Sequence, residues 1–345
     1  MDRKKIKQER KHISSSYLNL TFLTAFITLL ILLSFTAFFR NTIWNDELTL
    51  WEDVINKGAD KPRAYLGRGL DYNNKGQYDR AVEDYNKAIA LYPNYAYAYN
   101  NRGNVYNNKG QYDRAVEDYN KAIALYPNYA KAYYNRGNVY NSKGQHDMAI
   151  EDFNTAIAID PNYAYTYNNR GAAYEKKGQH DMAIEDFNTA IAIDPNYADA
   201  YINRGLAYYN KGQYDMAIED LNKAIALKPD YADAYNNRGT IYYNKGQHDR
   251  AIEDFNKVIA LDPNYAKAYY NRGLAYGKKG QHDRAIEDFN KAIALKSDYA
   301  NAYSGRGLAY SIKGNINRAI SDFQKACDLG SEIGCENLQE ALQKR

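Results

Sequence analysis

The chain contains one uniformly apolar stretch, followed by a long region in which apolar and polar positions alternate at helical spacing. Residues 17–39 form a run of 23 uncharged residues, YLNLTFLTAFITLLILLSFTAFF. At about 1.5 Å per residue, a helix of this length reaches about 34 Å, which is enough to cross the hydrocarbon core of a membrane. We therefore predict a transmembrane helix over 17–39.

The alternative interpretation of the apolar run is a cleaved secretory signal. Such signals have an apolar core of roughly 7–15 residues and a small-x-small cleavage site, and this run fits neither feature. Six Lys and Arg residues precede it within 1–16, whereas only Arg40 follows it before Asp46. Because basic residues flank spans on the cytoplasmic side, we predict a cytoplasmic tail at 1–16 and repeats on the extracytoplasmic (periplasmic) side.

Beyond the run, the pattern repeats every 34 residues. A glycine recurs at this spacing, without insertion or deletion, at 76, 110, 144, 178, 212, 246, 280 and 314. In residues 96–129, Tyr99, Gly103 and Tyr106 lie at helical spacing before the glycine. After it, small and apolar residues recur at i, i+4, i+7 and i+8: Ala115, Tyr119, Ala122 and Ile123. Each repeat is therefore predicted to be a pair of antiparallel helices, and eight such repeats span 62–333.

The flanks of the array are predicted to cap it. Residues 40–61 place Trp51, Val54 and Ile55 on one helical face, as the second helix of a preceding repeat would, so this segment is a linker with a half-repeat. Residues 334–345 form a final helix with one apolar face. Cys327 and Cys335 either form a disulfide in an oxidising envelope or remain two small buried thiols.

The repeated motif is aromatic-x-x-x-Gly-x-x-Tyr, then Ala-x-x-x-aromatic-x-x-Ala and Pro, and it resembles the tetratricopeptide repeat. The resemblance covers about four fifths of the chain. It implies an all-α fold, a right-handed superhelical solenoid of helix-turn-helix units preceded here by one transmembrane helix. In that family the first helices line a concave groove that commonly holds an extended peptide or a partner helix.

One departure from the family pattern is systematic, because an arginine stands where the family usually has leucine before the first-helix glycine. The arginines are Arg68, Arg102, Arg136, Arg170, Arg204, Arg238, Arg272 and Arg306. Every second helix also carries an aspartate: Asp84, Asp118, Asp152, Asp186, Asp220, Asp254, Asp288 and Asp322. We predict that each arginine pairs with an aspartate of its own or an adjacent repeat. The alternative is a ladder of positive charge that binds anionic ligands.

A second recurring feature is an amide in the first helix. Six successive repeats carry it, at Asn101, Asn135, Asn169, Asn203, Asn237 and Asn271. Amides both donate and accept hydrogen bonds, so a regular row can bind the backbone of an extended peptide with little regard for its sequence. This is similar to the asparagine ladder in the repeats of O-linked N-acetylglucosamine transferase. The alternative is that these amides only cap or bridge helices.

The residues beside this row change along the chain. Asn104 and Asn138 flank it in the early repeats and are predicted to join the peptide-binding set. Leucines follow in the later repeats, which therefore offer more apolar contact: Leu206, Leu274 and Leu308.

Charge and residue types exclude several other functions. The chain has 45 Lys and Arg against 42 Asp and Glu, and without residues 1–16 its net charge is −1. No nucleic-acid interaction is predicted, because such proteins need a basic surface. Neither a catalytic site nor a metal or other cofactor is predicted, since nearly every polar residue recurs from repeat to repeat. The recurring histidines stand where other repeats carry tyrosine, which indicates packing: His146, His180, His248 and His282.

These features predict a non-enzymatic, single-span membrane scaffold, in a bacterium, that binds a protein or peptide partner. The junction before the first repeat also resembles the repeat tail of membrane-embedded sugar transferases of the protein O-mannosylation type, whose tails lie on the non-cytoplasmic side. One alternative is therefore an accessory protein that presents polypeptide substrate to such an enzyme. The other alternative is a purely structural or self-associating array.

Overall fold

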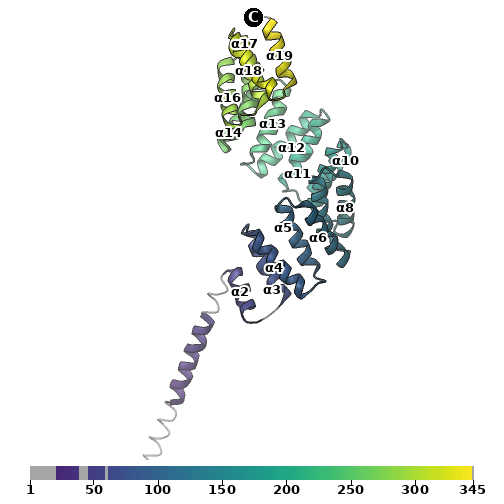
Figure 1. Ribbon diagram of the computed structural model, residues 1–345, viewed down its shortest axis with the longest axis vertical. Coiled ribbons are helices and arrows are strands. Elements are labelled where there is room, and N and C mark those ends of the chain that lie inside the picture. Colours follow the sequence, from purple (N-terminus) through teal and green to yellow (C-terminus); the bar gives the residue numbers. More distant parts are fainter. Residues whose placement is uncertain (1–20, 39–45, 59–60, 344–345) are drawn as a thin grey trace, which may run out of the picture. The chain divides into compact units, whose positions relative to one another are not determined.

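The fold is all-helical throughout residues 21–38, 46–58 and 61–343, which the computed structural model describes (Figure 1). An apolar helix covers Thr21–Phe38, with a mean hydropathy of 2.2. It is long and apolar enough to serve as a membrane anchor or as a signal sequence. The rest of the predicted span, at 17–20 and 39, and the basic tail 1–16 lie outside the described residues.

The predicted helix pairs are confirmed. The first helices of the eight repeats are α3 (Pro62–Asn74), α5 (Ala96–Asn108), α7 (Ala130–Ser142), α9 (Ala164–Lys176), α11 (Ala198–Asn210), α13 (Ala232–Asn244), α15 (Ala266–Lys278) and α17 (Ala300–Ile312). The second helices are α4 (Tyr78–Leu91), α6 (Tyr112–Leu125), α8 (His146–Ile159), α10 (His180–Ile193), α12 (Tyr214–Leu227), α14 (His248–Leu261), α16 (His282–Leu295) and α18 (Ile316–Asp328). Before and after them lie α2 (Glu47–Asn56) and α19 (Glu332–Gln343).

The recurring glycine reverses the chain between the two helices of a repeat. Gly110 has φ +70°, a backbone conformation that other residues rarely adopt. This conformation lets the N–H of Gln111 donate to the carbonyl oxygen of Tyr106 at 2.8 Å, and the N–H of Gly110 donate to Asn107 at 2.9 Å. These two bonds are those of a Schellman motif, which satisfies the last carbonyls of the first helix and ends it.

A second glycine lets the two helices of a repeat approach closely. A Cβ atom at Gly103 of α5 would lie 2.8 Å from the ring of Tyr119 on α6. That ring is fully buried, as is its counterpart in the other repeats: Tyr85, Phe153, Phe187, Leu221, Phe255, Phe289 and Phe323. The core is therefore a series of local clusters in which each large side chain packs over the glycine of its own repeat.

Two glycines of α15 provide a direct test of this packing. We expect Gly273→Ala to lower the free energy of unfolding by roughly 1–3 kcal/mol, because its Cβ would lie 2.8 Å from the Phe289 ring. Gly277→Ala, on the same helix, has no atom within 4 Å of the added Cβ. It should stabilise the helix by up to about 1 kcal/mol. Urea denaturation of the two variants measures the difference, and equal effects would contradict the packing argument.

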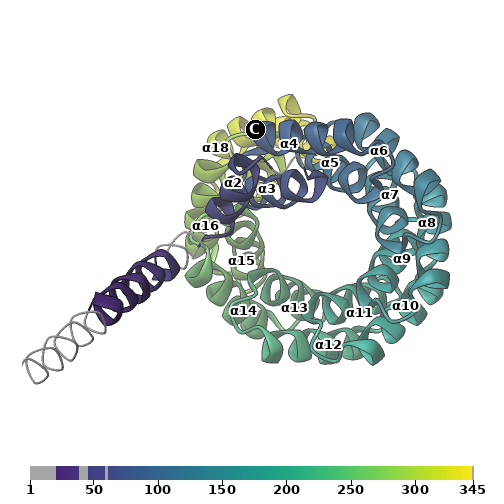
Figure 2. The ribbon, with the colours of Figure 1, turned by 90° about the horizontal axis from the view of Figure 1, so that it is seen from below.

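The helices group into two compact parts, an N-terminal part (1–139) and a C-terminal part (140–345). Within the C-terminal part, the first helices α9, α11, α13 and α15 lie on the inner side of a curved stack, and α10, α12 and α14 lie outside them (Figure 2). Consecutive first helices of this part contact one another, whereas the described second helices α10, α12, α14 and α16 contact only first helices. Residues that face the inner side must therefore come from first helices.

The predicted arginine–aspartate pairing is confirmed, and it occurs within each repeat. Arg102 donates from Nη2 to Asp118 Oδ1 at 2.6 Å and from Nε to Oδ2 at 2.8 Å. The same bidentate pair recurs in the other described cases: Arg68–Asp84, Arg170–Asp186, Arg204–Asp220, Arg238–Asp254, Arg272–Asp288 and Arg306–Asp322. These arginines thus have an internal carboxylate partner, which argues against the alternative of a ladder for anionic ligands.

From the second repeat onward, the arginine also reaches the preceding repeat, which the sequence did not reveal. Arg102 donates from Nη1 to Asn86 Oδ1 at 2.6 Å, and Asn86 lies on the second helix of the repeat before. Equivalent bonds join α9, α11, α13, α15 and α17 to the repeats before them. The guanidinium therefore joins its own second helix to that of its neighbour.

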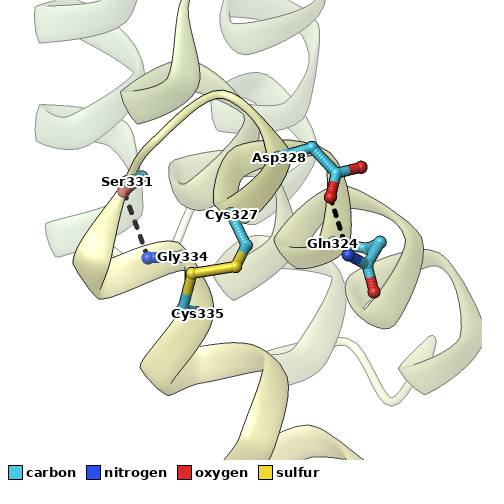
Figure 3. The surroundings of a disulfide bond; sticks show 6 residues. All are labelled: Gln324, Cys327, Asp328, Ser331, Gly334 and Cys335. Atoms are coloured by element: carbon cyan, nitrogen blue, oxygen red, sulfur yellow. Dashed lines mark hydrogen bonds between the residues drawn. A yellow bond between two sulfur atoms is a disulfide. The ribbon is translucent and has the colours of Figure 1, made fainter.

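At the end of the array, Cys327 of α18 and Cys335 of α19 form a disulfide (Figure 3). The side-chain oxygen of Ser331 accepts a bond from the N–H of Gly334 at 3.1 Å, which caps the first turn of α19. Gly334 lies close against Ala326, and Ala341 is buried, so α19 covers the apolar face of the last repeat. Of the two alternatives for the cysteines, the structure has the disulfide.

Replacing both cysteines by serine should loosen α19. A cross-link that closes so short a loop stabilises a fold by roughly 2–3 kcal/mol, because it restricts the unfolded chain. We expect faster hydrogen exchange in α19 and at the end of α18, with α15 and α16 unaffected because repeats contact only their neighbours. Hydrogen exchange with mass spectrometry checks this, and unchanged protection of α19 would show that packing alone holds the helix.

Candidate functional site

The candidate site is the row of first-helix amides, and buried asparagines hold it in place. In the N-terminal part, the Nδ2 of Asn100 donates to Asn101 Oδ1 at 3.3 Å. The Oδ1 of Asn100 accepts from Asn135 Nδ2 at 3.0 Å. Asn100 is 3% exposed, whereas the two row members are half-buried. One buried amide therefore fixes the side chains of two successive row members.

The same arrangement recurs in the C-terminal part. Asn168 donates to Asn169 Oδ1 at 3.1 Å and accepts from Asn203 Nδ2 at 2.9 Å. Two repeats further on, Asn236 accepts from Asn271 Nδ2 at 3.1 Å. Each bridge joins consecutive first helices, so the row lies where these helices meet. The alternative role of the amides, bridging of helices, is thus present, and it leaves them further hydrogen-bonding capacity.

This remaining capacity determines what the row can do. Asn203 uses one of its two Nδ2 hydrogens on Asn168, and Asn271 does the same with Asn236. The second hydrogen and the carbonyl oxygen of each of these side chains make no hydrogen bond within the described part of the protein. A donor and an acceptor held in fixed positions on successive helices match the alternating N–H and C=O groups of an extended peptide.

The two flanking asparagines of the predicted set, Asn104 and Asn138, have other surroundings than the bridged members of the row. Asn104 accepts a hydrogen bond from the buried hydroxyl of Tyr119 at 2.7 Å, so its carbonyl oxygen has a partner in the core. Asn138 is half-buried on α7. Asn237, a member of the row, is half-buried on α13 beside the buried Asn236.

The bridging residues Asn100, Asn168 and Asn236 were missed as part of the site. Their signal was present, because an asparagine stands at this place in the second, fourth and sixth repeats, 68 residues apart. The alternate repeats carry Tyr134, Ile202 or Tyr270 there. The sequence shows this alternation but not that one amide spans two helices, because that depends on how closely the helices pack.

Apolar surface adjoins the row in the C-terminal part. A hollow of about 190 Å³ lies between α15 and α17, and residues of α16 also line it. Its lining residues come from four helices: Tyr243, Gly273, Leu274, Gly277, Lys278, His282, Ala285, Phe289, Gly305, Leu308, Ala309 and Ile312. The predicted apolar character of the later repeats is thus present at Leu274 and Leu308, whereas Ile202 is buried.

The recurring histidines take part in local contacts at the starts of second helices. His146 Nδ1 lies 2.7 Å from Asn141 Oδ1, and His180 Nδ1 lies 2.9 Å from Glu175. Among the described residues, no three His, Cys, Asp or Glu side chains are grouped so as to hold a metal ion.

Models of the tetratricopeptide repeat match most of the chain. A TPR repeat model matches residues 69–110, 103–141, 137–178, 176–212, 205–246 and 239–280. Tetratricopeptide repeat models match 266–299 and 300–329. The chain belongs to the tetratricopeptide repeat family. This architecture is a scaffold typical of protein–protein interaction.

Solved tetratricopeptide repeat structures resemble this one in fold. The crystal structure of the APC/C hetero-tetramer Cut9–Hcn1 matches with a TM-score of 0.60 and 20% identity, over 81% of this chain and 55% of that one. A tetratricopeptide repeat protein from Parabacteroides merdae matches with a TM-score of 0.58 and 23% identity, over 72% and 98% of the two chains. At these identities the likeness concerns the fold alone.

A further crystal structure, that of MamA, is 36% identical over 48% of this chain and 96% of its own, with a TM-score of 0.44. No curated protein matches the chain.

Proposed function

We propose that this tetratricopeptide repeat protein is a membrane-anchored scaffold that holds an extended segment of a partner protein along its amide row. The observation that carries the proposal is the bridging of the row by buried asparagines. Burying Asn168 and Asn236 costs free energy unless they are hydrogen-bonded, and their bonds hold Asn203 and Asn271 in one orientation. Fixed amides lose little conformational entropy on binding, which favours peptide affinity.

Two features support an extracytoplasmic location. The apolar helix Thr21–Phe38 follows a basic tail, as in proteins whose N-terminus remains in the cytoplasm. The disulfide between Cys327 and Cys335 would persist in an oxidising compartment and would be reduced in most cytosols. Both agree with a single-span anchor and repeats on the outer side of the membrane.

Crosslinking in intact cells tests the proposed binding. A benzoylphenylalanine at position 203 should form discrete adducts on illumination, and mass spectrometry should identify one recurrent polypeptide. The same residue at Glu219, which is exposed on the second helix α12, is the control and should form no such adduct. Adducts of equal yield at both positions, or at neither, would contradict binding along the row.

Protease treatment tests the location separately. Protease added to spheroplasts should digest the repeats and leave the membrane-embedded segment. Protection of the repeats, with digestion only after lysis, would place them on the cytoplasmic side while leaving the binding proposal open to the crosslinking test.

A further inference from the structure

The hollow between α15 and α17 is an apolar recess with room for one large side chain. Its volume of about 190 Å³ corresponds to roughly six water molecules at about 30 Å³ each. Phe289 and Ala285 of α16 form its floor, and Leu274 and Leu308 border it on the two first helices. Ordered water gains little in such a recess, because few polar groups line it.

The recess exists because one repeat lacks a side chain that the others have. At the place of Gly277, other repeats carry Asn141, Glu175, Tyr209 or Tyr243. Those side chains cover the start of the following second helix. For example, Glu175 contacts His180, Tyr209 packs on Tyr214, and Tyr243 packs on His248.

Without such a side chain, His282 lacks the neighbour that its counterparts have. Its Nδ1 is buried without a hydrogen-bond partner, as is the Nδ1 of His248, whereas the Nδ1 of His180 is paired with Glu175. Gly277 therefore leaves open space beside His282. In the described repeats with Tyr209 or Tyr243, the same space is taken by the protein itself.

Apolar side chains at the rim are unusually exposed. Leu308 is 45% exposed and Ile312 is 66% exposed, and both lie on α17 beside the recess. Single exposed apolar residues are common, but two that border one apolar recess form a continuous patch of the kind that marks interaction sites.

The charge at the rim is positive and uncompensated. Lys278 is the basic residue of the lining beside the neutral imidazole-bearing His282, and no acidic residue lines the recess. Neighbouring lysines are paired, Lys279 with Asp249 and Lys313 with Asp283, whereas Lys278 forms no ion pair with the residues that the structure describes. A partner with a carboxylate beside its apolar group would complement this charge.

The recess continues the amide row. Asn271, Leu274 and Lys278 follow one another on α15 at intervals of three and four residues, so they lie on one face of the helix. A peptide whose backbone is bound at Asn271 therefore passes directly beside the recess.

We propose that the recess binds one large apolar side chain of the partner peptide and that Lys278 pairs with an acidic residue next to it. The inference rests on the proposed peptide-binding function and names the peptide class. Burial of a Leu or Phe side chain is worth roughly ten- to a hundredfold in affinity. The pairing with Lys278, at a partly exposed rim, contributes a smaller factor.

Peptide selection on the full-length protein in lipid nanodiscs tests the inference. Phage that display random dodecapeptides are panned against the wild type, and dissociation constants of the enriched peptides are then measured. We expect the enriched peptides to share a Phe, Leu, Ile or Met next to an Asp or Glu. The variant Gly277→Tyr, which restores the residue of two other repeats, should weaken binding at least tenfold. Gly277→Ala is its control and should change binding less than threefold.

The charge is tested with a matched pair of lysines. Lys278→Glu should weaken the binding of peptides that contain the acidic residue about three- to tenfold. It should not weaken the binding of peptide variants in which that acidic residue is replaced by Ser. Lys176→Glu changes the equivalent residue of the repeat that begins with α9, and it should have no effect.

Other outcomes would contradict the inference, the proposed function or both. If Gly277→Tyr binds the enriched peptides as tightly as the wild type, or if these peptides lack an apolar–acidic pair, the inference is wrong. The peptide-binding function still stands in that case if binding is lost in Asn203→Ala/Asn237→Ala/Asn271→Ala. If the wild type enriches no peptide, the proposed function and the inference both fail.

Discussion

Replacing Asp254 by asparagine should lower the free energy of unfolding by roughly 3–5 kcal/mol, the range found when one partner of a buried ion pair is removed. Asp254 is 5% exposed and accepts two bonds from Arg238, at 2.6 and 2.9 Å. Asparagine would keep the shape but would turn an N–H group toward a guanidinium that has only donors. The positive charge of Arg238 would then remain, mostly buried, without its counter-charge.

The electrostatics of the pair explain why the loss is large. Burial raises the pKa of the Asp254 carboxyl, and the hydrogen bond and charge of Arg238 oppose that rise. The carboxylate is thus kept ionised by its arginine against the cost of desolvation. Removing either partner leaves that cost unopposed.

Asp249→Asn is the matched control, because Asp249 lies on the same helix, α14, and also pairs with a lysine, Lys279. Its side chain is 79% exposed, and exposed pairs contribute about 0–1 kcal/mol. Urea denaturation, monitored by circular dichroism, gives the loss in free energy of unfolding for both variants when the curves are fitted to a one-dimensional model of coupled repeats. Similar losses for the two variants would show that Asp254 contributes no more than a surface pair.

The triple variant Asn203→Ala/Asn237→Ala/Asn271→Ala should weaken the binding of a selected peptide about 10- to 1,000-fold. Each amide hydrogen bond contributes a net value of roughly 0.5–1.5 kcal/mol, and about 1.4 kcal/mol is a factor of ten. Isothermal titration calorimetry with a peptide enriched on the wild type measures the loss.

Two controls separate binding from folding. Asn203→Ala removes the partner of the buried Asn168, so the triple variant should also lose some stability. The single variant Asn237→Ala breaks no side-chain hydrogen bond among the described residues, and it should weaken binding about threefold to tenfold with unchanged stability. The outer-surface variant Glu219→Ala/Glu253→Ala/Glu287→Ala should bind as the wild type does. Unchanged affinity in both asparagine variants would leave the row with a structural role only.

Most of the fold could be predicted because each of its determinants is local. The glycine at 110, the small residue at 103 and the ring at 119 are spaced as a helix pair requires, and the structure places them in contact. The Arg102–Asp118 pair was also predictable, since two opposite charges recurred together on faces that pack. The domain boundaries predicted from the sequence remain predictions.

The site was less predictable, because it depends on distances between repeats. The bridging role of Asn168 requires two first helices to approach within the reach of one side chain. The recess at Gly277 depends on a missing side chain, which a pattern of present residues does not display. The peptide-binding role of the eight predicted asparagines remains a prediction.

The bond from each arginine to the asparagine of the repeat before it has a direction. Arg272 reaches back to Asn256, and Arg306 reaches back to Asn290. A ribosome releases the chain from its N-terminus, so earlier parts of a protein generally fold first. Every hairpin after the first therefore meets, as it forms, an asparagine acceptor that its predecessor already presents, so growth of the array in the order of translation completes each bond between repeats as soon as the new arginine is in place.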